Sequence, residues 1–224
     1  MAKKQPKNRQ MPPQQQKQQH QRSPQFDRSM GFGEHVARGL YAGWRAIVFW
    51  DVEGFKFLEF SGRAVFRSFA ALLFASPIYF LTMYLEGLSE TADGMHSTPD
   101  WVLWIGYVVA WLVFAVAMFY LVRILNLGQH FIRFISGYHW ARVFAIAMFL
   151  PYHILTEFRL VPIEADNYIL MATAAWVLYA EILMFKHVLK TMWPYAVFLA
   201  LMDFATFQVI RSEIIRGFLT TAGT

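Results

Sequence analysis

The chain has 224 residues, of which 57% are hydrophobic, 18% aromatic and only 16% charged, with a net charge of +5. A soluble domain usually carries about 25% charged residues, so this composition and a mean hydropathy of +0.34 exclude an ordinary soluble domain and predict an integral membrane protein. The absence of cysteine excludes disulfides, thiolate chemistry and cysteine-ligated iron–sulfur clusters.

Residues 1–30 carry nearly all of the positive charge. They hold seven basic residues against Asp27, whereas the rest of the chain has 13 basic and 14 acidic residues. This segment is rich in glutamine and proline and has almost no large apolar side chains, so it cannot bury enough surface to offset the entropy of ordering. We expect a disordered cytoplasmic tail, and not a secretory signal, because an apolar core is missing. Its basic side chains are predicted to contact anionic lipid or an acidic partner: Lys3, Lys4, Lys7 and Arg9.

Residues 31–61 form an amphipathic interfacial region. Apolar residues recur at helical spacing, at Val36, Leu40, Trp44, Ile47 and Val48. Such a pattern predicts a helix that either lies among lipid headgroups or packs against other helices of the same protein. Both alternatives stay open at the level of sequence. The basic residues outside this stripe are predicted to add to the docking surface: Arg38 and Arg45.

The segment 62–212 is predicted to be the transmembrane domain. Five stretches are long and apolar enough to cross a bilayer: 64–85, 101–122, 139–158, 167–188 and 195–210. Because lipid satisfies no backbone hydrogen bonds, each span must be a helix, and the fold class is an all-α polytopic bundle of about five transmembrane helices. The last stretch is short, so its full crossing is left open, and residues 213–224 are expected to be a C-terminal tail. Pro77 and Pro151 fall inside spans and are predicted to be structural kinks.

The distribution of basic residues predicts the orientation. Loops on the side of the N-terminus are rich in lysine and arginine, whereas the first opposite loop holds Glu86, Glu90, Asp93 and Asp100. Positive residues accumulate on the cytoplasmic side, so the N-terminus is expected in the cytoplasm. We expect a multi-pass protein of a bacterial-type inner membrane.

Two carboxylates lie inside apolar spans, at Glu181 and Asp203. Each is eleven residues from Met192, the expected turn between the last two spans, so both are predicted to lie at one depth near the membrane middle. Two buried carboxylates side by side repel, and one is expected to hold a proton. They are therefore candidates for proton or cation movement. The alternative is a packing role, with a proton or a hydrogen bond to Tyr179, Thr206 or Gln208 satisfying each acid.

The histidines allow two weaker hypotheses. His139 and His153 are fourteen residues apart on one predicted span, which leaves them about 40° apart on one face, a spacing that resembles paired haem ligands in cytochrome b helices. Other spans lack a matching pair. His153 and Glu157 form a pair with helical spacing and are weak metal-ligand candidates, so we expect neither a bound metal nor a cofactor.

The sequence contains no motif of a catalytic or nucleotide site and no nucleic-acid motif. The leading hypothesis is a non-enzymatic scaffold, assembly or adaptor factor for a membrane complex, with anionic lipids and a membrane-protein partner or a second copy as its contacts. The alternative is a small proton- or cation-coupled transporter that uses Glu181 and Asp203. A haem-bearing membrane redox subunit is the third hypothesis.

Overall fold

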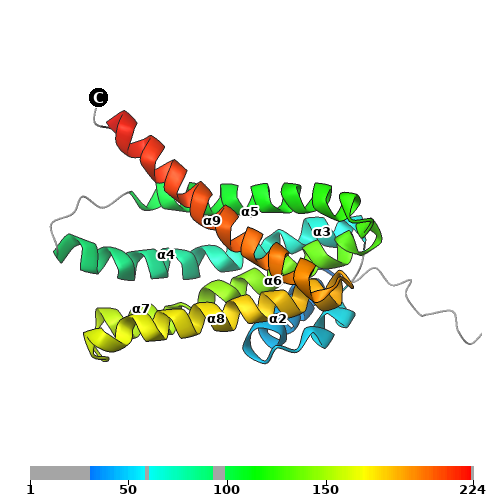
Figure 1. Ribbon diagram of the computed structural model, residues 1–224, viewed down its shortest axis with the longest axis horizontal. Coiled ribbons are helices and arrows are strands. Elements are labelled where there is room, and N and C mark those ends of the chain that lie inside the picture. The colour runs from blue at the N-terminus through cyan, green and yellow to red at the C-terminus, as the bar shows by residue number, and fades with distance from the viewer. Residues whose placement is uncertain (1–30, 59–60, 93–98, 223–224) are drawn as a thin grey trace, which may run out of the picture. The chain divides into compact units, whose positions relative to one another are not determined.

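The computed structural model describes residues 31–58, 61–92 and 99–222, and residues 32–224 group as one compact unit. The basic tail, with Lys3, Lys4, Lys7 and Arg9, lies outside the described residues. The described part of the chain is helical and contains no strand, which confirms the all-α prediction. Figure 1 shows the arrangement of the helices. The elements are α2 (Phe32–Val48), η1 (Val52–Phe57), α3 (Gly62–Ser68), α4 (Ala70–Ala92), α5 (Asp100–Ile124), η2 (Gly128–His130), α6 (Phe131–Ala147), α7 (Leu150–Glu157), α8 (Ile163–Val188) and α9 (Trp193–Ala222).

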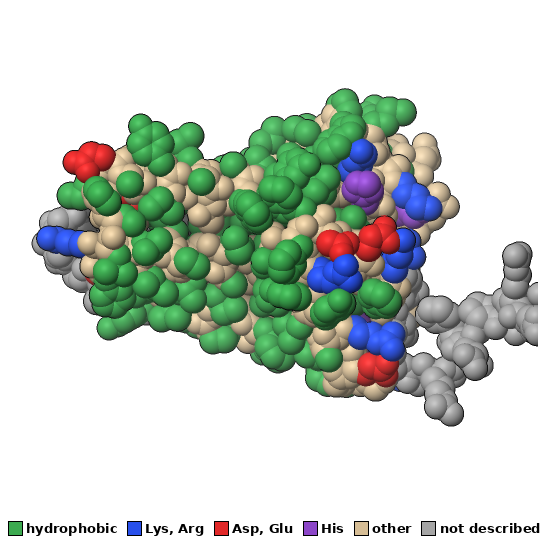
Figure 2. Space-filling model, turned by 90° about the horizontal axis from the view of Figure 1, so that it is seen from below, with side chains coloured by type: hydrophobic (Ala, Val, Ile, Leu, Met, Phe, Trp, Pro, Cys, Tyr) green, Lys and Arg blue, Asp and Glu red, His purple; other side chains and the backbone are tan. Residues whose placement is uncertain are grey.

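Four helical segments of the described chain are long and apolar enough to cross a membrane. They are Gly62–Leu85, Trp101–Ile124, Ile163–Val188 and Trp193–Ile214, and they match four of the five predicted stretches. α9 has 30 residues and extends about 45 Å, so the last span is not short, and the helix continues through most of the expected C-terminal tail. On the face seen in Figure 2, charged side chains gather toward the ends and apolar side chains cover the region between them, as a multi-pass membrane protein requires.

The predicted third span, residues 139–158, is not one continuous helix. α6 begins earlier, at Phe131, and ends at Ala147, while α7 begins at Leu150. Pro151 has no N–H and cannot donate to the carbonyl of Ala147, which explains why the first helix stops there. Neither helix alone has the length of a span. In Figure 1, α7 follows α6 along the bundle, and this broken pair is not among the four candidate spans of the described chain, so the fifth predicted span is not confirmed.

α2 packs directly on α6 through small residues. A Cβ atom on Gly43 would lie 2.4 Å from the backbone oxygen of Trp140, and one on Gly39 would lie 2.2 Å from the indole of the same tryptophan. Only glycine permits this close approach. Of the two alternatives for this helix, packing against another helix of the same protein therefore holds for the buried side of α2. Trp44, from the predicted apolar stripe, instead faces outward with 41% of its surface exposed.

A sharp turn joins α2 to η1, and we call residues 32–57 the α2–η1 corner. The carbonyl of Arg45 accepts hydrogen bonds from the backbone N–H groups of Phe49 and Asp51, at 3.1 and 3.0 Å. The guanidinium of Arg45 pairs with Asp51, whose side chain caps η1. The indole N–H of Trp176 on α8 donates to the carbonyl of Ile47 at 2.9 Å. The corner is thus packed against α6 and hydrogen-bonded to α8.

Candidate functional site

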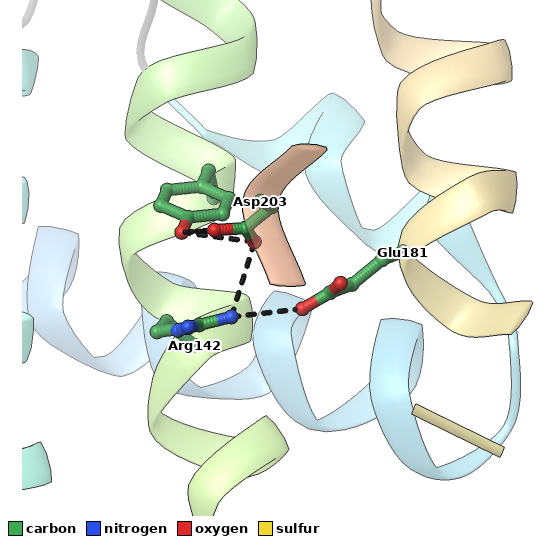
Figure 3. A network of polar contacts seen from close by, with 4 residues as sticks. Arg142, Glu181 and Asp203 are labelled. Carbon is green, nitrogen blue, oxygen red and sulfur yellow. Dashed lines mark hydrogen bonds and ion pairs between the residues drawn. The ribbon is translucent and has the colours of Figure 1, made fainter. Parts of the chain in front are cut away.

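The candidate site is a polar network inside the bundle, built from α6, α8 and α9 (Figure 3). Tyr138 and Arg142 are four residues apart on α6, so helical geometry places them on one face, one turn apart. Glu181 comes from α8 and Asp203 from α9. The two predicted carboxylates therefore meet side chains from a third helix.

Arg142 lies between the two acids. Its Nη1 atom is 3.1 Å from Glu181 Oε1 and 3.1 Å from Asp203 Oδ2. The hydroxyl of Tyr138 donates to Asp203 and lies 2.9 and 3.1 Å from the two carboxylate oxygens. One guanidinium nitrogen thus links α6 to both of the last two helices.

The network is almost completely removed from the surface, since Glu181 is 5% and Asp203 1% exposed. Buried charges are tolerated when they are paired and hydrogen-bonded, and here each carboxylate has at least one such partner. Two ionised carboxylates against one guanidinium leave a formal charge of −1, and one bound proton would neutralise the cluster. The arrangement can therefore fix three helices together, and its carboxylates can hold one proton between them.

Sequence reasoning missed both α6 members of the network. The predicted third span began at residue 139, which placed Arg142 near its end, and other hydrogen-bond partners were proposed for the carboxylates. Of these, Tyr179 packs against Trp50, with ring centroids 4.9 Å apart. The available signal was an arginine inside a largely apolar stretch, because such residues usually have a buried counter-ion.

The haem hypothesis relied on one continuous third span, and that premise is wrong. His139 belongs to α6 and His153 to α7. His139 is fully buried, and its Nδ1 atom is 2.8 Å from the hydroxyl of Ser68. His153 and Glu157 both lie on α7. Within the described ranges, no three histidine or acidic side chains group as a metal site would require.

The remaining predicted site residues lie apart from the network. Arg38 pairs with Glu34, and Arg45 with Asp51, so both basic residues of α2 have acidic partners within the corner. Pro77 lies inside α4, and Pro151 stands at the start of α7. Comparisons with protein-family models, curated proteins and solved structures gave no match.

Proposed function

We propose that this chain is a non-enzymatic multi-pass protein of a bacterial-type inner membrane, with a cytoplasmic N-terminus, that scaffolds or helps to assemble a membrane complex. The observation that carries the proposal is the α2–η1 corner. The corner is fastened to the bundle by α2–α6 packing and by the Trp176 hydrogen bond, yet it leaves large aromatic side chains uncovered. A rigid base with an exposed aromatic face is the form that a docking surface takes.

The exposed face of the corner consists of Tyr41, Trp44 and Phe49, with 47%, 41% and 59% of their surfaces exposed. The rings of Trp44 and Phe49 meet edge to face with centroids 4.9 Å apart, and Tyr41 lies beside Trp44. Tyrosine and tryptophan dominate the binding energy of many interfaces because they bury much area and lose little conformational freedom. We assign this face to a membrane-protein partner.

The ion-pair network supports the same proposal from inside the bundle. Arg142 joins α6, on which the corner rests, to α8 and α9. A displacement of the corner would therefore have to move α6 together with α8 and α9. This coupling suits a protein that holds other subunits in place.

The experiment removes the aromatic face and measures partner recovery. Tagged full-length protein is purified from its own membrane in mild detergent, and the double variant Trp44→Ala/Phe49→Ala is compared with the wild type by quantitative mass spectrometry. We expect a stoichiometric membrane-protein partner with the wild type and at least tenfold less of it with the variant, because interface hot spots contribute about 2 kcal/mol or more each. Leu73→Ala/Phe198→Ala removes exposed apolar side chains of α4 and α9 and serves as the matched control.

Equal recovery with the corner variant would overturn the docking role of this face, provided that thermal unfolding shows both proteins folded. If the only protein recovered is a second copy of the chain, the adaptor role is wrong and the aromatic face is the interface of a homo-oligomer. Deletion of residues 1–30 tests the tail separately. If localisation, partner recovery and phenotype are all unchanged by that deletion, the tail has no docking role.

A second candidate function, proton- or cation-coupled transport, is favoured by the excess carboxylate in the network. Because Glu181 and Asp203 share one arginine, the cluster can alternate between a charge of −1 and neutrality by binding one proton. Glu181→Gln and Asp203→Asn keep the hydrogen-bonding shape and remove this exchange. In vesicles with an imposed potential and an internal pH dye, both variants should lose the proton flux of the wild type. Equal flux by wild type and variants would eliminate this candidate.

A further inference from the structure

A surface pocket lies between η1, α6 and α8, away from the ion-pair network. It has a volume of about 90 Å³ and is lined by Val52, Glu53, Phe55, Lys56, Arg133, His187 and Val188. One water molecule needs only about 10–15 Å³, so the pocket is large enough for a group of several heavy atoms. Lys56 and Glu53 pair at its rim, where both side chains are largely exposed.

The pocket is electropositive. Lys56 and Arg133 contribute two positive charges to its lining against one negative charge from Glu53. Next to it, the pKa of His130 is lowered by burial and by the nearby positive charges of Lys190 and Arg133. Arg133 thus connects the lining to two further basic residues outside it, His130 on η2 and Lys190 just after α8. An anion that enters the pocket would offset the mutual repulsion of these groups.

The pocket also stands at a membrane boundary. His187 and Val188 are at the end of the candidate span Ile163–Val188, and η1 precedes the span that begins at Gly62. Charged side chains gather at the right-hand end of the visible face in Figure 2, which is the end of the bundle where α8 ends in Figure 1. The apolar residues Val52, Phe55 and Val188 add hydrophobic surface to the lining of the pocket. Lipid phosphates lie at this depth, and basic pockets between membrane helices bind anionic headgroups.

We propose that the pocket between η1, α6 and α8 binds the phosphate of an anionic lipid headgroup, with Arg133 as the main cation and Lys56 and His187 as further hydrogen-bond donors. The apolar lining accepts the first carbons of the lipid chains. This site is independent of the scaffold role proposed above, because it does not include the exposed aromatic residues of the corner.

The experiment uses full-length protein in nanodiscs of phosphatidylcholine, with or without phosphatidylglycerol. Native mass spectrometry measures how much phosphatidylglycerol stays bound after release. Arg133→Gln should retain about fivefold less, the effect of removing one cation beside an anionic lipid. Arg133→Lys should retain most of it. Arg63→Gln, which removes an exposed cation outside the pocket, is the matched control and should behave like the wild type.

NMR of labelled histidine gives a second measurement. Phosphatidylglycerol should raise the titration midpoint of His130 in the wild type and in Arg63→Gln, since the bound phosphate opposes the charges of Arg133 and Lys190, and the shift should be much smaller in Arg133→Gln. Equal lipid retention by Arg133→Gln and Arg63→Gln, with both folded, would overturn the site. Inorganic phosphate in phosphatidylcholine nanodiscs should leave the midpoint unchanged. An equal shift with inorganic phosphate would show that the ligand is free phosphate and not a lipid.

Discussion

Replacement of Arg142 by leucine is expected to destabilise the bundle by about 3–5 kcal/mol, because it leaves two buried carboxylates without their counter-ion. Glu181 and Asp203 would then face each other in a region from which lipid and water are both excluded. Thermal unfolding in detergent micelles, followed by tryptophan fluorescence, measures the loss. We expect a clearly lower midpoint and, in cells, a lower amount of protein in the membrane.

A matched control removes an arginine that is not buried. Arg123 lies in the last turn of α5, exposed, over the ring of Phe119, and Arg123→Leu should change stability little. The triple variant Arg142→Leu/Glu181→Gln/Asp203→Asn should recover much of the loss, because no charge then remains buried. If the midpoint of thermal unfolding of Arg142→Leu equals that of the wild type, the network does not hold the helices together.

Substitution of Gly43 by alanine should also destabilise the protein, by about 1–3 kcal/mol, although alanine is the better helix former. The added Cβ would stand 2.4 Å from the backbone oxygen of Trp140, so α2 and α6 must move apart. Limited proteolysis of the turn after Val48, together with thermal unfolding, measures the separation. We expect faster cleavage there and a lower midpoint.

Two other glycines of α2 provide the comparison. A Cβ on Gly33 meets no atom within 4 Å, so Gly33→Ala should be neutral or slightly stabilising. Gly39→Ala meets the indole of Trp140, a side chain that can be trimmed, and the added change Trp140→Phe should relieve part of that clash. Trp140→Phe should not rescue Gly43→Ala, because the added Cβ would clash with the backbone of residue 140 and not with its side chain. Equal stability of Gly43→Ala and Gly33→Ala would contradict the close packing of α2 on α6.

The sequence predicted the elements that depend on long apolar runs. The spans around α5 and α8 were placed within a few residues, since hydropathy and length decide such helices locally. The third span was predicted less well. Its predicted start, His139, lies eight residues after Phe131, the first residue of α6, so Arg142 was expected less than one turn from a helix end, whereas it lies about three turns after the start of α6.

The common depth of Glu181 and Asp203 followed from simple hairpin geometry, and the structure brings both to one guanidinium nitrogen. Their partner was missed because no local pattern tells which residue of a distant helix faces them. The sequence left open that α2 packs against other helices, but it did not identify α6 as the partner. Gly39 and Gly43 are four residues apart, a spacing that permits close helix packing, but the apolar stripe through Trp44 gave the stronger periodic signal.

The chain order of the ion-pair network has a consequence for biogenesis. Arg142 is translated before either of its counter-ions, which follow 39 and 61 residues later. An arginine at the centre of a lone helix opposes membrane insertion by about 2.5–3.5 kcal/mol. Arg142 therefore makes the insertion of α6 into lipid less favourable until its counter-ions are present. We expect the insertion machinery to retain this helix until α8 and α9 have been synthesised, so that the protein reaches its final topology only near the end of translation.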